Sequence, residues 1–230
     1  ADTAVHLWDD NADGYVARAW TWPDQRSAEA NRDWLQATRG YRKRLRSGEA
    51  EQAKRPLALA LAMRAWTRTA RDTWHMAGGI AVQQTLQELQ LAIQESSEAS
   101  RLDDGLPLAL VTEALASAQH AEVFKRMGRP SDPAPALRAA DLAVRKFPNF
   151  PPAHYARALV LTGLGDARAA IRDLTEAVRQ DPTFGDAFAL RAVLHAARTL
   201  CGEARSDLEK AKTLLGDVSR LGEVVRQSCG

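Results

Sequence analysis

Apolar residues recur at helical spacing along most of the chain. Leu86, Leu89 and Ile93, for example, fall on one face of a helix with 3.6 residues per turn. The same pattern predicts helices over residues 24–46, 49–75, 80–101 and 106–127. Pro56 predicts a break or kink in the second of these, because proline lacks the backbone N–H of an interior helical bond. Residues 1–23 have no such pattern and are expected to be irregular.

The C-terminal half of the chain has a longer period, which the spacing of Pro148 and Pro182 defines. Each of these prolines follows a helix-like run. Alignment on them gives matching pairs of small or apolar residues, namely Ala153 and Ala187, Ala158 and Ala192, Ala170 and Ala204, Leu174 and Leu208, and Ala177 and Ala211. A fixed period of about 34 residues is typical of proteins built from stacked supersecondary units.

Each unit of this period is predicted to be two antiparallel helices joined by a short turn. Two helices approach closely only where their facing side chains are small, and Ala158 and Ala170 are expected at that crossing. Gly163 and Gly165 stand where the first helix must end, because glycine readily adopts the left-handed conformation of a helix C-terminus. The second helix is expected to end before Pro182.

These residues and their spacing resemble the tetratricopeptide repeat (TPR). The resemblance covers residues 117–228 and implies an all-α fold, an α-solenoid of antiparallel helix pairs with additional N-terminal helices. Residues 151–184 and 185–218 match the repeat well, residues 117–150 form a degenerate unit, and residues 217–228 fit a capping helix. Residues 111–230 are therefore interpreted as the repeat domain. Residues 1–110 are interpreted as a Trp-rich helical region, whose hairpins are either unrelated helices or repeats that have drifted.

The resemblance also implies where a partner would bind, because the first helices of TPR units line a concave groove. The groove residues expected to contact a partner are Tyr155, Leu159, Thr162, Asp186, Leu190, Val193, Lys125 and Arg129. The groove lacks the Lys, Asn and Arg clamp with which the best-known subgroup binds the C-terminal carboxylate of chaperones. It is mainly apolar and would be costly to leave in water. Either a segment of a protein or peptide partner occupies it, or the chain's own N-terminal segment fills it.

The two cysteines of the chain, Cys201 and Cys229, bear on its cellular compartment. In the repeat interpretation, Cys201 lies in the turn of the last unit. The second helix of that unit and the capping helix run in opposite directions over similar lengths, so Cys229 should return beside Cys201. A disulfide would join the capping helix to the last repeat and would indicate a periplasmic or extracellular protein. The alternative is a cytoplasmic protein with two unrelated thiols.

No sequence pattern points to an enzyme active site or to a cofactor. The chain has no phosphate-binding glycine loop and no HExxH, CxxC or GxSxG motif. His120 and His154 occupy equivalent positions in successive units, which places them about 10 Å apart, too far to share a zinc ion. Packing is the preferred interpretation of both, and of His195. The adjacent His75 and Met76 are the alternative candidates for a metal or haem site.

All six tryptophans lie in the N-terminal third of the chain, at Trp8, Trp20, Trp22, Trp34, Trp66 and Trp74. They are interpreted as a core for the N-terminal helices. The alternative is an aromatic ligand pocket or a protein-binding hot spot, with residues 19–22 as the best exposed candidate. That alternative would make the protein a helical domain with a small-molecule or metal site at its Trp-rich end, acting as an accessory subunit of a transport or catalytic complex.

Composition excludes some classes of protein. The 31 Lys and Arg residues nearly balance the 29 Asp and Glu residues, so a net charge of +2 gives no bulk attraction to nucleic acid. Arg39, Arg42, Lys43, Arg44 and Arg46 form a local basic run, interpreted as a solvated helix face. No apolar run reaches the roughly 18 residues of a membrane span. The expected function is a protein-binding scaffold or adaptor and not an enzyme, and a homo-oligomer is compatible with the sequence.

Overall fold

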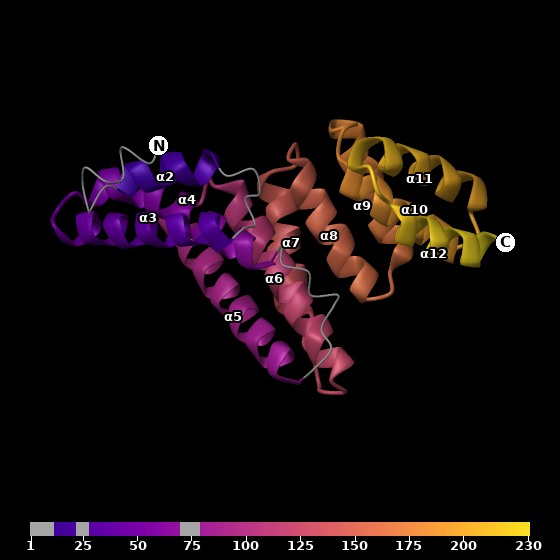
Figure 1. The fold of residues 1–230 in the computed structure, drawn as a ribbon, viewed down its shortest axis with the longest axis horizontal. Coiled ribbons are helices and arrows are strands. Elements are labelled where there is room, and N and C mark those ends of the chain that lie inside the picture. The colour runs from indigo at the N-terminus through magenta and orange to yellow at the C-terminus, as the bar shows by residue number, and fades with distance from the viewer. Residues whose placement is uncertain (1–11, 22–27, 70–78) are drawn as a thin grey trace. The chain divides into compact units, whose positions relative to one another are not determined.

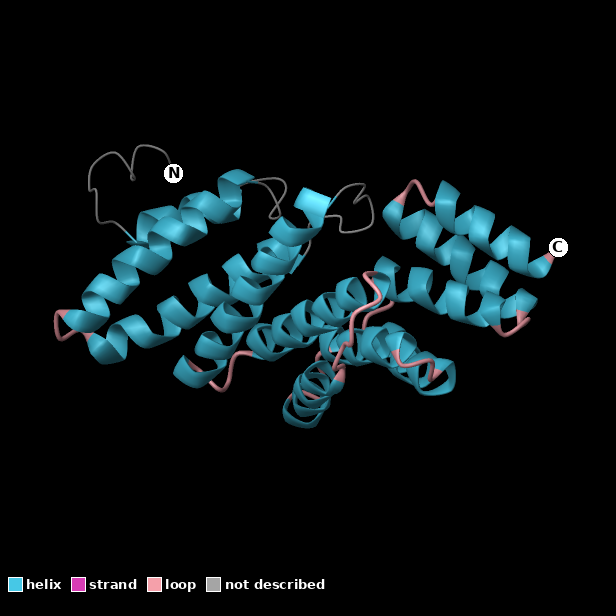
Figure 2. Cartoon of the chain, turned by 90° about the horizontal axis from the view of Figure 1, so that it is seen from below, coloured by secondary structure: helices cyan, strands magenta, loops and turns pink. Residues whose placement is uncertain are grey.

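The computed structural model describes residues 12–21, 28–69 and 79–230, and every regular element among them is an α-helix (Figure 1, Figure 2). The prediction of an all-α fold is confirmed. The chain divides into two compact units, Ala1–Ala139 and Ala140–Gly230, each with its own hydrophobic core. The division falls within α7 (Ala134–Lys146), whereas the sequence pattern placed a boundary at residues 110 and 111.

The described part of the first unit contains five complete helices. They are α2 (Ala12–Thr21), α3 (Ala28–Arg46), α4 (Ala50–Thr69), α5 (Gly79–Leu102) and α6 (Pro107–Arg126). Each helix packs against the next one along the chain, and α4 also contacts α6. The four helices predicted between residues 24 and 127 are therefore present, although residues 24–27 and 70–75 lie outside the described part of the chain.

α2 is a helix in a segment that was expected to be irregular, so that expectation is wrong for residues 12–21. Its buried residues, Ala12, Gly14 and Ala19, are all small, and the larger Tyr15 and Val16 pack beside them against the core. This apolar side spans only ten residues, so its signal in the sequence is short. α2 instead lies very close to α3, since a Cβ added to Gly40 would be 2.9 Å from the Cβ of Ala12. Only glycine at position 40 permits this approach without a shift of the helix.

The basic run on α3 connects this helix to its neighbours. Arg44 Nη1 lies 2.9 Å from Asp13 Oδ2 on α2, and Arg42 Nη2 lies 2.5 Å from Glu98 Oε2 on α5. Tyr41 also donates a hydrogen bond of 2.6 Å to Asp13. Arg42 and Arg44 therefore have intramolecular partners, and the basic run is not a purely solvated face.

α4 continues through Pro56, so of the predicted break or kink the break is wrong. The missing N–H of Pro56 leaves the carbonyl of Gln52 without its usual helical partner. Because Gln52 is exposed, water can satisfy that carbonyl. The loss is small enough for the packing of α4 to override it.

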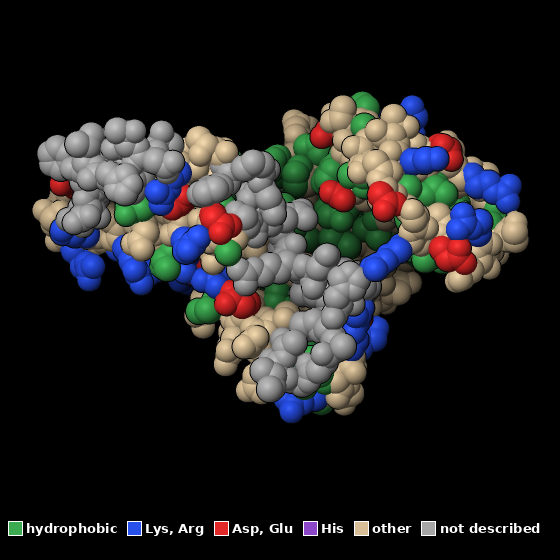
Figure 3. Space-filling view, viewed as in Figure 1, with side chains coloured by type: hydrophobic (Ala, Val, Ile, Leu, Met, Phe, Trp, Pro, Cys, Tyr) green, Lys and Arg blue, Asp and Glu red, His purple; other side chains and the backbone are tan. Residues whose placement is uncertain are grey.

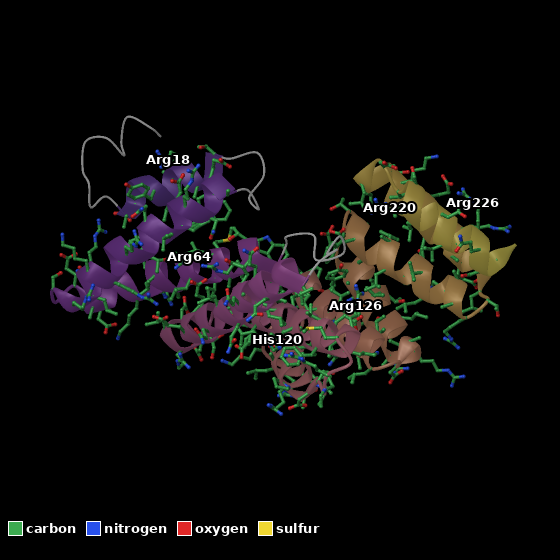
Figure 4. The ribbon with its side chains drawn as sticks, turned by 60° about the horizontal axis from the view of Figure 1, so that its bottom comes forward. Arg18, Arg64, His120, Arg126, Arg220 and Arg226 are labelled. Carbon is green, nitrogen blue, oxygen red and sulfur yellow. A yellow bond between two sulfur atoms is a disulfide. The ribbon has the colours of Figure 1, made fainter. Side chains whose placement is uncertain are left out.

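Charged side chains share the interior of the first unit with large apolar ones. Trp34, Leu57 and Leu61 are fully buried. Arg64 and Arg68 on α4 both pair with Glu95 on α5, at 2.9 and 3.2 Å (Arg64 is labelled in Figure 4). Buried charges require partners of this kind, because desolvation penalises an isolated ion strongly.

The second unit contains the two clear repeats and the capping helix. Its complete helices are α8 (Pro151–Gly163), α9 (Ala167–Gln180), α10 (Gly185–Ala197), α11 (Cys201–Leu215) and α12 (Ser219–Cys229). α8 packs on α9, α9 on α10 and α10 on α11, and α12 contacts both α10 and α11. This succession of antiparallel pairs is the α-solenoid arrangement that the repeat predicts.

Small residues and turn residues account for these helix pairs. Ala158 and Ala170 are both fully buried in the core shared by α8 and α9, as expected for the close crossing of the pair. Gly165 adopts a φ of 81°, which suits glycine after a helix C-terminus. Asp166 then begins α9, because its side chain accepts a hydrogen bond of 2.9 Å from the backbone N–H of Ala169.

α12 continues the repeat register as the first helix of a further pair would. Ser219, its first residue, falls one repeat period after Gly185, the first residue of α10. Gly222 and Val225 are its buried residues. At the register position of Ala192 in α10, α12 carries Arg226, whose side chain is 71% exposed. α12 therefore covers the last repeat with an apolar side and presents a polar outer side (Figure 4).

Candidate recognition surface

Apolar side chains on α8 and α10 form a half-buried surface on the second unit. Tyr155 and Leu190 lie at the edge of the core between the helices, and the ring of Tyr155 is 5.0 Å from that of Phe184, centroid to centroid. Leu159 and Val193 are also half-buried. Figure 3 shows hydrophobic side chains gathered in the region of α8 and α9. We refer to Tyr155, Leu159, Thr162, Asp186, Leu190 and Val193 as the recognition surface.

The polar members of the expected site differ in their surroundings. Thr162 is half-buried, and its hydroxyl donates to the carbonyl of Ala158 at 2.7 Å. Asp186 is exposed in the first turn of α10. Lys125 and Arg129 are exposed at and after the C-terminal end of α6, in the first unit. The structure therefore gathers six of the eight expected contact residues on two helices of one unit.

Two partly buried arginine–aspartate pairs connect α8 and α10, which carry this surface, to α9 and α11, and sequence reasoning missed them. Arg157 Nε and Nη2 donate to the two carboxylate oxygens of Asp173 at 2.7 and 2.6 Å. Arg191 donates to Asp207 in the same way at 2.8 and 2.7 Å. The two arginines are one repeat period apart, as are the two aspartates, so the repeat alignment contained a signal. It was overlooked because charged residues in helices are usually solvated.

Each of these arginines also reaches back to the preceding helix pair. Arg157 Nη1 lies 3.4 Å from Asp141 on α7, and Arg191 Nη1 donates to the hydroxyl of Thr175 on α9 at 3.2 Å. One guanidinium therefore contacts its own helix pair and the helix before it. Arginine suits this role because its planar group presents five donors in fixed directions. The two arginines form a ladder that we call the arginine ladder.

A histidine lies beside each buried aspartate, and the pKa values of the two imidazoles are shifted in opposite directions. His154 Nδ1 lies 3.7 Å from Asp173, and Nε2 contacts the carbonyl of Pro148 at 2.8 Å. The Asp173 carboxylate raises the pKa of His154 against the opposing effect of burial. Burial raises the pKa of Asp173, but Arg157 and His154 outweigh it and the pKa is lowered. Burial lowers the pKa of His195, although Asp207 lies 3.7 Å away.

The remaining histidines offer no metal site in the described residues. His120 stacks on Phe124 with ring centroids 4.8 Å apart, and burial lowers its pKa. No group of three or more His, Cys, Asp or Glu side chains is arranged to hold a metal ion in the ranges that the structure describes. His75 and Met76 lie outside those ranges. In the same ranges, no helix combines the length and apolar character that crossing a bilayer requires.

The described tryptophans are divided between the core and the surface. Trp34 is fully buried in the core of the first unit. Trp20 packs edge-on against it at 5.3 Å and remains 51% exposed. Trp66 is half-buried on α4, while Trp8, Trp22 and Trp74 lie outside the described residues. Of residues 19–22, the expected exposed segment, Ala19 is buried and Trp20 is exposed.

The two cysteines lie together at the end of the second unit. Cys201 is the first residue of α11 and Cys229 is the last residue of α12. Their sulfur atoms are 2.16 Å apart and their Cα atoms 5.6 Å apart, as in a disulfide. Both residues are half-buried and thus partly accessible to solvent.

The chain is similar to several solved structures. No protein-family model matches it, and no curated protein matches its sequence. The thermophilic TPR protein TTC0263 of Thermus thermophilus aligns with a TM-score of 0.61 and 17% identity, over 94% of this chain and 98% of that one. MamA aligns with a TM-score of 0.53 and 17% identity, over 84% and 96% of the two chains. YrrB, described as a TPR protein with an unusual peptide-binding site, aligns at 0.50 and 18%, over 98% and 97%.

The chain has a TPR-like fold. These identities are low, and the likeness concerns the fold alone. In the TPR-like array, α8 and α10 are the first helices of their pairs, the helices that the resemblance assigns to the groove. The recognition surface therefore lies on these two first helices. The arginine ladder binds each of them to the second helix of its pair.

We predict that Arg191→Met lowers the free energy of unfolding by about 3 kcal/mol, because it leaves the buried Asp207 carboxylate without its cation. Urea unfolding followed by circular dichroism measures the change. Arg226→Met is the matched control, since Arg226 is 71% exposed, and should have little effect. Adding Asp207→Leu to Arg191→Met should restore most of the loss. Equal effects of Arg191→Met and Arg226→Met would contradict a role for the arginine ladder in stability.

We predict that the two repeat histidines affect stability with opposite dependence on pH. The folded-state pKa of His154 is raised above its ordinary 6.5, so its contribution is fully present below 6.5 and is lost as pH rises through the higher value. The comparison variant His154→Phe copies Phe188 of the next repeat. The free energy of unfolding of the wild type, relative to that of His154→Phe, should therefore increase on acidification. The pKa of His195 is lowered, so the free energy of unfolding of the wild type relative to His195→Phe should decrease on acidification. Urea unfolding at several pH values tests both, and slopes of one sign would refute the assignment.

Proposed function

We propose that this protein is an interaction scaffold or adaptor that binds a segment of a protein or peptide partner through the recognition surface. The observation that best supports this proposal is the row of half-buried apolar side chains on α8 and α10, namely Tyr155, Leu159, Leu190 and Val193. Such a row suits a helix or an extended segment that inserts apolar side chains. The TPR-like fold, and the peptide-binding site in the description of YrrB, support this kind of partner.

The chemistry of the surface limits the class of partner. The six residues of the recognition surface include one charged side chain, Asp186, and no cation. A free carboxylate at the end of a peptide would find no clamp there, so we propose recognition of apolar side chains within a segment. Lys125 and Arg129 remain candidates for a separate contact from the first unit. Asp186, exposed in the first turn of α10, would interact with a polar or cationic group beside the apolar segment.

We propose that the function involves no catalysis and no cofactor. The buried charged groups of the second unit are used for structure: Asp173 and Asp207 each accept two hydrogen bonds from one arginine. Groups held in this way are poorly placed to exchange protons with a substrate. The alternative site at the Trp-rich end retains Trp20 as its exposed side chain, and no further observation favours it.

The proposed interaction predicts that Leu159→Glu and Leu190→Glu abolish partner binding, because each puts a charge on the apolar surface. Peptides selected from a random displayed library on the wild-type protein supply the ligand. Leu164→Glu is the matched control: Leu164 follows α8, is 44% exposed and lies outside the recognition surface, so binding should persist. Circular dichroism checks that each variant is folded. Unfolding of both surface variants, with a folded control, would instead mean that the chain's own segment fills the surface.

We also propose a periplasmic or extracellular location, with a cytoplasmic location as the alternative. The close pair of Cys201 and Cys229 supports this, since disulfides persist in oxidising compartments and are rare in the cytosol. Alkylation of free thiols at the moment of cell lysis, followed by mass spectrometry, should add no label to the protein. Reduction before alkylation should add two. Two labels without reduction would refute the disulfide and with it the proposed location.

A further inference from the structure

The last helix of the array is weakly attached by its side chains. α12 has eleven residues, and only Gly222 and Val225 are buried. Val225 lies in a small cluster with Ala192 and Ala196 of α10 and Ala204 of α11, against which Leu208 and Cys229 also pack. An isolated helix of this length is unstable in water, so α12 depends on its docking for its own structure. One buried valine and a few alanine contacts are a small apolar interface for an entire helix.

The disulfide is placed to compensate for this weak attachment. Cys229, at the C-terminal end of α12, is bonded to Cys201 at the N-terminal end of α11, across a sequence separation of 28. The backbone connects the opposite ends of the two helices through Gly216 to Val218. α12 is therefore held covalently at both ends. Without the disulfide, it would be held only at its N-terminal end.

α12 also occupies a position relevant to binding. In the repeat register, Arg220 and Val224 of α12 follow Asp186 and Leu190 of the recognition surface. Val224 is 43% exposed, and the equivalent residue of α10, Leu190, belongs to the recognition surface.

We propose that the Cys201–Cys229 disulfide is a redox-operated lock on α12, and that α12 is the third helix of the recognition surface. Reduction by a dithiol breaks the Sγ–Sγ bond, transfers two electrons and two protons to give two thiols, and leaves the dithiol as a disulfide. The half-buried cysteines are accessible to such a reductant. α12 then detaches, exposes the apolar face of α10 and α11, and removes Arg220 and Val224 from the surface. The second part of the proposal rests on the proposed function; the lock does not.

Hydrogen exchange followed by mass spectrometry tests the lock without any partner. After reduction with dithiothreitol, peptides from α12 should exchange roughly tenfold faster or more, because a locally unfolding segment loses protection first. Peptides from α8 and α9 should keep their protection. The Cys201→Ser/Cys229→Ser variant should match the reduced wild type with or without dithiothreitol. The dye 8-anilinonaphthalene-1-sulfonate should fluoresce more strongly with the reduced protein, because the face under α12 is uncovered.

Unchanged protection of α12 in protein whose two thiols are verified by mass would overturn the lock. The role of α12 in binding has a separate test with the peptides selected on the oxidised wild type. Val224→Glu in the oxidised protein should weaken their binding, whereas Leu164→Glu, at an exposed position outside the recognition surface, should not. Full binding by Val224→Glu would remove α12 from the surface and leave the lock intact. Failure to select any peptide would contradict the proposed function, and the exchange experiment would still decide the lock.

Discussion

The fold depends on the close approach of paired helices at positions that carry only small side chains. Ala158 meets α9 and Ala192 meets α11 without a side chain that would separate the two backbones. A similar close contact occurs near the start of the described chain, where Ala12 of α2 packs against Gly40 of α3. Close crossings bring larger neighbours such as Leu174 into contact and determine which face of each first helix remains outside. The recognition surface is that remaining face.

A small-residue interface buries little apolar area per helix, so the chain also uses paired charges for cohesion. In the first unit, Arg64 and Arg68 join α4 to α5 through Glu95. In the second, Arg157 and Arg191 each join the two helices of their own pair and also contact the helix before it. Buried ion pairs often add little stability over apolar replacements, but they strongly penalise arrangements in which a partner is lost. A shifted register of the stacked helices would leave these carboxylates without their cations and would carry that penalty.

Local signals explain how much of this architecture the sequence could predict. α8 to α12 follow from prolines, turn glycines and alanines whose effects are independent of the rest of the chain, and the recognition surface follows from their register. α2 was missed because its apolar side, made of Ala12, Tyr15, Val16 and Ala19, lies within only ten residues and consists partly of small side chains. The pairing of Arg157 with Asp173 depends on which helices are neighbours in space. Considered one at a time, both charged residues would be expected to face water. Continuity at Pro56 likewise depends on tertiary packing.

The arginine ladder has a consequence for how the second unit unfolds. The stability of a stacked array is the sum of a term intrinsic to each helix pair and a coupling term between neighbours. Arg157 and Arg191 contribute to both terms, since each bonds within its own pair and to the preceding helix. Strong coupling relative to the intrinsic term makes partially folded arrays rare. The two arginines therefore favour joint unfolding of the helix pairs that they connect, whereas α12, which lies beyond the last arginine of the ladder, is attached to them through the Cys201–Cys229 disulfide.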